Sequence, residues 1–171
     1  MDRKLVFING EKNEAGGSVQ IVGGLTGSGK TTYLIKEIAK AVKNNESVLA
    51  FPMEHDYRDF VEAFSRALSP GVYDTSKSDN EISTEIEKAN ELISNADLII
   101  QYGLTSDEAI IEKIKEYGSQ KNSGLIVIDH LGFPLSQFNS EEGLLKFAEK
   151  FNPGLGCRVL ISTQIARRNL R

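Results

Sequence analysis

Cysteine is nearly absent from this chain of 171 residues, in which Cys157 is the only one. A single cysteine excludes an intramolecular disulfide and a zinc cluster built from several cysteines. No apolar run approaches the roughly 20 residues that span a bilayer. The early apolar run at Leu5–Ile8 is too short for the core of a signal peptide. We therefore expect a cytoplasmic location and no membrane partner.

An excess of positive charge is also missing, because 20 Lys and Arg residues face 24 Asp and Glu residues, for a net charge of −4. This balance disfavours a strongly basic nucleic-acid clamp, so any contact with nucleic acid would have to come from a local patch. Hydrophobic residues make up 40% of the chain and charged residues 26%, which is ordinary for a globular protein. The length fits one domain, and we predict a single domain over residues 1–171.

Short apolar runs alternate with longer amphipathic stretches along the whole chain. Strands that alternate with helices predict βαβ units, and hence an α/β fold with a mainly parallel sheet flanked by helices on both faces. Ligands bind at the carboxyl ends of such strands, so functional residues should follow strands. The expected strands are Leu5–Ile8, Ser18–Gly23, Ser47–Phe51, Asp97–Gln101, Gly124–Ile128 and Arg158–Ser162. The expected helices are Lys30–Lys43, Tyr57–Leu68, Glu81–Asn95, a helix capped by Thr105 and Glu108 and ended by Gly118, and Glu141–Phe151, with a loop over Val72–Asn80.

A glycine-rich segment joins one of these strands to the next helix. Its sequence, Gly24-Leu25-Thr26-Gly27-Ser28-Gly29-Lys30-Thr31, matches the phosphate-loop pattern G-x-x-x-x-G-K-[ST]. The glycines let backbone N–H groups point at phosphate oxygens, and the helix adds the positive end of its dipole. The pattern predicts that Lys30 reaches the β- and γ-phosphates and that the Thr31 hydroxyl ligates Mg²⁺. The predicted nucleotide-binding residues are Gly24, Gly27, Ser28, Gly29, Lys30, Thr31 and Thr32.

Carboxylates follow two of the other expected strands. Asp129 ends the apolar run Leu125–Ile128, which is the Walker B pattern whose aspartate holds Mg²⁺, often through water. The alternative for Asp129 is an ordinary cap of a turn. Glu54 follows the strand after the phosphate-loop helix, where a carboxylate can orient an attacking water. The alternative for Glu54 is a solvated loop residue.

Together these elements resemble the RecA-type ATPase core of DnaB-like replicative helicases, from about Ser18 to Arg168. Phe51-Pro52-Met53-Glu54 matches a family element whose glutamate is the catalytic base, and Leu104–Ile110 is similar to the element upstream of Walker B. Ile128–Phe133 matches the family's Walker B, and Ile161–Arg167 matches a strand end whose glutamine senses the γ-phosphate.

The resemblance implies a three-layer, RecA-like P-loop NTPase fold that takes ATP and Mg²⁺. It implies that Glu54 is the catalytic base and that Gln164 senses the γ-phosphate and couples it to DNA-binding loops. It also implies a homo-oligomer, a hexameric ring, that acts on single-stranded DNA or with a partner helicase.

Some residues depart from the family's pattern. His130 stands where the family has tyrosine, and Pro52 and His55 are unusual beside the glutamate. Each histidine either lies near the nucleotide or is a polar loop residue. The chain ends soon after the glutamine strand, so we expect a minimal or C-terminally truncated core. Its basic cluster, Arg167, Arg168 and Arg171, either contacts phosphate or forms a solvated tail.

Three functions remain open at this point. The first is a Mg²⁺-dependent ATPase of the RecA/DnaB type, acting in DNA replication, unwinding or translocation. The second is a small-molecule kinase, which needs an arginine-bearing lid, although Arg58 and Arg66 are the only arginines between Lys30 and Arg158. The third is an ATP-binding switch that loads or regulates a partner and turns over negligibly.

Overall fold

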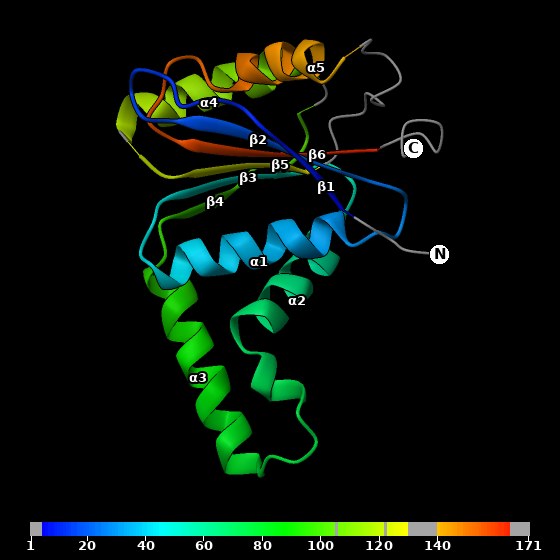
Figure 1. Ribbon diagram of the computed structural model, residues 1–171. Helices are drawn as coiled ribbons and strands as arrows, with labels where there is room; N and C mark the ends of the chain where they lie inside the picture. Colours follow the sequence, from blue (N-terminus) through cyan, green and yellow to red (C-terminus); the bar gives the residue numbers. More distant parts are fainter. Residues whose placement is uncertain (1–4, 105, 122, 130–139, 165–171) are drawn as a thin grey trace.

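A computed structural model describes residues 5–104, 106–121, 123–129 and 140–164. Within these residues one six-stranded sheet is covered by helices on both faces, which makes three layers (Figure 1). The predicted α/β class and its layers are therefore confirmed. The predictions for Thr105, for His130 and for the three C-terminal arginines lie outside the described residues.

The sheet is parallel except at one edge. Its strands are β1 (Val6–Asn9), β2 (Ser18–Gly24), β3 (Val48–Pro52), β4 (Leu98–Ile100), β5 (Leu125–Asp129) and β6 (Arg158–Gln164), in the order β1-β2-β6-β5-β3-β4. Only β1 runs antiparallel to its neighbour, as the pairing of β1 with β2 shows among the described strands. The last strand in sequence, β6, thus lies between β2 and β5, and its register places Gln164 opposite Gly24.

The helices divide between the two faces of the sheet. On one face lie α1 (Lys30–Lys43), α2 (Tyr57–Leu68) and α3 (Asp79–Asn95), and on the other lie α4 (Asp107–Gln120) and α5 (Glu141–Ala148) (Figure 1). Short 3-10 turns follow α2, at Pro70–Tyr73, and α5, at Glu149–Phe151. The bounds of α1 and α2 are those that the sequence predicts.

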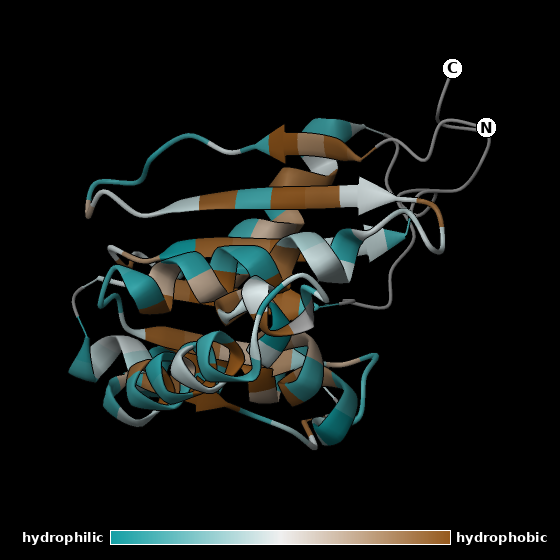
Figure 2. Cartoon of the chain, turned by 90° about the horizontal axis from the view of Figure 1, so that it is seen from below, coloured by the Kyte–Doolittle hydropathy of each residue, from teal (hydrophilic) through white to brown (hydrophobic). Residues whose placement is uncertain are grey.

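Central strands bury side chains on both faces. In β3, Leu49 and Phe51 pack with α4 and α5, whereas Val48 and Ala50 pack with α1 and α2. Successive strand residues point to opposite faces, so a strand covered on both sides must be apolar throughout. The helices alternate between polar and apolar turns (Figure 2), because each covers the sheet with one face only. Cys157 is fully buried within this core, and burial raises the pKa of its thiol.

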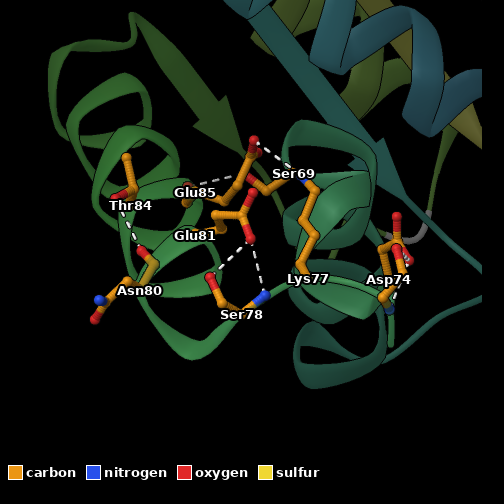
Figure 3. A network of polar contacts seen from close by, with 9 residues as sticks. Ser69, Asp74, Lys77, Ser78, Asn80, Glu81, Thr84 and Glu85 are labelled. Atoms are coloured by element: carbon orange, nitrogen blue, oxygen red, sulfur yellow. Dashed lines mark hydrogen bonds and ion pairs between the residues drawn. The ribbon is translucent and has the colours of Figure 1, made fainter.

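The region around α3 differs from the prediction of a loop over Val72–Asn80. A 3-10 turn occupies Pro70–Tyr73, and α3 begins at Asp79, two residues earlier than expected. The backbone N–H of Ser78 donates to the Glu81 carboxylate at 2.9 Å, which caps the helix (Figure 3). The Oγ of Ser69 donates to the carbonyl oxygen of Glu85 at 3.1 Å, which ties the turn to α3.

The apolar face of α3 is less covered than its spacing suggests. Ile86 is 43% exposed and Ile93 is 37% exposed, while Ala89 is buried. Figure 1 shows the cause, because α3 runs away from the sheet below α1 instead of lying along it.

Two predicted boundaries of α4 are wrong. The helix is capped at Ser106, whose Oγ accepts from the Ala109 N–H at 3.2 Å, one residue after the expected Thr105. Gly118 lies inside α4 and does not end it. A Cβ on Gly118 would lie 2.4 Å from a Leu155 methyl carbon, so this glycine permits close packing.

Candidate functional site

The glycine-rich segment forms a tight loop between β2 and α1. Gly29, at the N-cap of α1, has a φ of 92°, in the left-handed region where a Cβ costs energy. A Cβ on Gly24 would lie 2.2 Å from Ser28 Oγ, so the loop folds back too closely for a larger residue. One glycine is therefore needed for its backbone conformation and the other for a close approach.

Lys30 begins α1 and is only 7% exposed. Its Nζ donates to the carbonyl oxygens of Gly24 and Leu25, each at 3.1 Å. These bonds satisfy an ammonium group that would otherwise be costly to bury. The positive charge thus lies inside the curl of the loop, where the predicted role requires it.

Asp129 ends β5 and is 2% exposed. Its Oδ1 accepts a hydrogen bond from Ser162 Oγ at 2.6 Å. Its Oδ2 has no hydrogen-bond partner among the described residues and lies 3.7 Å from His55 Nδ1. The carboxylate is therefore held firmly by one oxygen and presents the other toward the loop after β3.

Glu54 lies in that same loop, two residues after the end of β3 at Pro52. The loop begins beside β5, because the Met53 N–H donates to the Asp129 carbonyl oxygen at 3.2 Å. Pro52 lacks an N–H, but it is the last residue of β3, beyond the last β4 pair at Ala50. The unusual proline is therefore tolerated where the ladder ends.

Gln164 ends β6 and reaches the phosphate loop. Its Nε2 donates a hydrogen bond to Thr26 Oγ1. This contact follows from the register of β6 with β2, which pairs Gln164 with the residue that opens the loop, Gly24. Sequence reasoning missed Thr26, because nothing in the loop pattern marks this variable position as the partner of a side chain so far along the chain.

These segments converge on one cavity of about 360 Å³ at the carboxyl ends of the strands. Its walls are Thr26, Gly27, Gly29, Lys30, Thr31, Thr32, Glu54, His55 and Gln164. Three predicted site residues lie outside the walls: Gly24 accepts from Lys30, Ser28 packs against Gly24, and Asp129 lies behind His55. The remaining predicted residues are brought together.

The donor atoms near this cavity fit a hard cation. Thr31 offers a hydroxyl to the cavity, and Asp129 offers a buried carboxylate oxygen without a hydrogen-bond partner among the described residues. Mg²⁺ prefers oxygen ligands and commonly takes one or two from protein while its other ligands are water or phosphate. The predicted Mg²⁺ ligands are thus of the right chemistry.

A second and larger cavity of about 700 Å³ adjoins the first, between α1 and α2. The two share Thr31, Thr32 and His55. The other walls of the second cavity are Ile35, Lys36, Ala63, Arg66, Ala67 and Pro70. Arg66 pairs there with Glu62, one helical turn earlier.

Among the helices that the structure describes, none combines the length and the apolar composition that crossing a membrane requires.

Comparison with known proteins reveals a likeness in structure but not in sequence. No protein-family model matches the chain, and no curated protein matches it. By contrast, 65 chains of solved structures match. One is the ATPase domain of a DnaB-like helicase, with a TM-score of 0.63 and 16% identity over 91% of this chain. The chain spans 59% of the length of that domain. The likeness establishes the fold, so this chain has the three-layer α/β architecture of RecA-like P-loop ATPases.

Proposed function

We propose that this protein binds ATP together with Mg²⁺ and hydrolyses it, as an ATPase of the RecA/DnaB type. One observation carries the proposal: Lys30, Thr31, Glu54 and Gln164 come from three separate segments and line one cavity. A cavity walled by a phosphate loop, a carboxylate and a strand-end amide has the groups that phosphoryl transfer to water needs.

The phosphate loop would bind the triphosphate. Lys30 would exchange its bonds to Gly24 and Leu25 for bonds to phosphate oxygens, and the loop amides would add neutral donors. Thr31 and Asp129 would hold Mg²⁺, which when bound neutralises charge on the β- and γ-phosphates. These contacts place the γ-phosphoryl group at the mouth of the loop, near Glu54.

Glu54 is proposed as the base. Its carboxylate would orient a water and accept its proton as the water oxygen attacks the γ-phosphorus in line. A new P–O bond forms to the water oxygen while the bond to the β-phosphate oxygen breaks, and ADP leaves with that electron pair. Glu54 is exposed on the wall of the cavity, where a water has access.

Gln164 is proposed to report whether the γ-phosphate is present. A γ-phosphate oxygen would compete with Thr26 for the Gln164 amide, so hydrolysis would change the partner of the last residue of β6. The segment after β6 would then shift with the nucleotide state.

At the level of partners, we propose a homo-oligomer, a hexameric ring, that acts on single-stranded DNA or with a partner helicase in replication, unwinding or translocation. Support comes from the sequence resemblance to DnaB-like helicases and from the fold shared with the ATPase domain of one such helicase. The net charge of −4 requires any DNA contact to be local.

The decisive experiment is steady-state ATP hydrolysis with Mg²⁺, with and without single-stranded DNA, for the wild type, Glu54→Gln and Glu142→Gln. Glu142 is a matched control, because it is a glutamate that pairs with Lys146 on the surface of α5, away from the cavity. We expect Glu54→Gln to abolish turnover while ATP still binds, and Glu142→Gln to behave as wild type. Unchanged turnover in Glu54→Gln would show that the base is assigned wrongly.

A second candidate function, a small-molecule kinase, is favoured by the larger cavity beside Thr31 and His55, which has room for an acceptor and carries Arg66. Transfer of phosphate from ATP to a panel of nucleosides would establish this function in place of the ATPase. Tight ATP binding with negligible turnover of the wild type would instead identify a nucleotide-dependent switch.

A further inference from the structure

The contact between His55 and Asp129 is not accounted for by the proposed hydrolysis. His55 Nδ1 and Asp129 Oδ2 are 3.7 Å apart, which exceeds the length of a hydrogen bond. Both atoms are buried, and neither has a hydrogen-bond partner among the described residues. Buried polar atoms are almost always satisfied, so this pair calls for a group between them.

A third donor completes the arrangement. One ligand atom each from Glu54, His55 and Asp129 can be chosen so that all three lie within 4.8 Å of one another. Two ligands that each lie about 2.1 Å from a shared metal ion at a tetrahedral angle are about 3.4 Å apart. The separation of 3.7 Å between the nitrogen and the oxygen is within a small shift of that value.

We propose that Glu54, His55 and Asp129 form a site for a divalent transition-metal ion, occupied in the nucleotide-free protein. An imidazole nitrogen with two carboxylates suits ions such as Mn²⁺, Co²⁺ and Zn²⁺, whereas Mg²⁺ favours oxygen ligands alone. The site shares two residues with the proposed ATPase but requires no hydrolysis, so the two proposals stand or fall separately.

The scaffold holds these ligands in place before any ion binds. Ser162 fixes the other oxygen of Asp129 at 2.6 Å, and the Met53 N–H joins the start of the β3 loop to the Asp129 carbonyl. The imidazole is 38% exposed and lines both cavities, so an ion has a way in from solvent. Water or a phosphate oxygen would complete the coordination.

The test is a titration of the full chain with Co²⁺, without nucleotide, followed by visible absorption, together with Mn²⁺ binding followed by electron paramagnetic resonance. We expect one ion per chain, ligand-field bands for Co²⁺, and nitrogen hyperfine coupling for Mn²⁺. His55→Asn should weaken binding at least about tenfold, since even residues outside the coordination sphere cost that much in other sites. The variant should also remove the nitrogen coupling.

Two controls make the outcome specific. Glu142→Gln, a surface carboxylate on α5, should bind the ion as the wild type does. His130→Asn changes the only other histidine and should keep the nitrogen coupling. Absent binding in the wild type, unchanged binding in His55→Asn, or loss of the coupling in His130→Asn instead would overturn the proposal. Urea unfolding of each variant shows whether it is folded. ATP turnover with Mg²⁺, measured in parallel, tests the proposed function on its own.

Discussion

The Gln164 side chain donates a hydrogen bond to Thr26 Oγ1 across 138 residues of sequence. The bond joins the end of β6 to the phosphate loop after β2, and both strands end at the same edge of the sheet. A change in the loop is therefore felt directly by the segment that follows β6. This link is the structural basis for treating Gln164 as a sensor.

If this link matters for turnover, Gln164→Ala and Thr26→Ala should be coupled. We expect each to lower kcat/KM for ATP hydrolysis, and the double variant to lose less than the sum, with a coupling energy of about 0.5–1.5 kcal/mol, the net value of a hydrogen bond. Thr26→Ser keeps the hydroxyl and should retain most of the activity. Additive losses in the double-mutant cycle would mean that the two side chains act independently.

Lys30→Met should weaken ATP binding about 10- to 100-fold, because hydrogen bonds to a charged group contribute about 1.5–3 kcal/mol. Methionine keeps the length and the apolar stem of the side chain but removes the charge. Isothermal titration calorimetry with ATP and Mg²⁺ measures the effect. Lys40→Met removes a charge from the exposed side of the same helix and should leave affinity unchanged. Equal affinity in Lys30→Met would remove Lys30 from the binding site.

Gly17→Ala should destabilise the fold by about 2–3 kcal/mol, the upper part of the range for overpacking. A Cβ at this buried position would lie 2.0 Å from the Leu155 carbonyl oxygen, and backbone cannot move aside cheaply. Gly143→Ala is the matched control, since the nearest neighbour of its new Cβ would be Ser140 Oγ at 3.4 Å, and α5 should gain about 0.5–1 kcal/mol. Urea denaturation measures both, and equal stability of the two variants would contradict the packing argument.

The stability of the sheet's amino-terminal edge should depend on pH through Asp97. Hydrogen bonds from Lys121 and Ser47 lower the pKa of this carboxyl. A lowered folded-state pKa stabilises the protein above the unfolded pKa, and the contribution disappears as pH falls through the folded value. Asp97→Asn should therefore lose stability at pH 7, by less than about 1 kcal/mol for so exposed a group, but not near pH 2. An equal loss at both pH values would assign the effect to packing.

Much of the local structure is predictable because its signals lie close together in sequence. The bounds of α1 follow from the loop glycines before it and from apolar residues at helical spacing, and those of α2 from a similar face with Phe60 and Phe64, both buried. The local pattern predicts that the last strand ends at Ser162, but β6 continues to Gln164 because β2 pairs with it that far. Pairing with a partner strand is not encoded in the strand itself.

Packing decided the positions where local signals misled. Gly118 has the residue type of a helix stop, yet α4 continues through it because Leu155, distant in sequence, packs against its open side. Ile86 and Ile93 have the spacing of a buried face, yet α3 leaves the sheet and exposes them.

By itself, the sequence determined the phosphate loop, the alternation of strands and helices, and the presence of polar groups after the strands, because each of these depends on neighbours within a few residues. Only the tertiary structure decided that β6 lies between β2 and β5, and hence that Gln164 meets Thr26 and that His55 meets Asp129. The physical reason is that strand order minimises the free energy of the whole packed sheet, in which residues far apart in the chain bury one another's apolar surface.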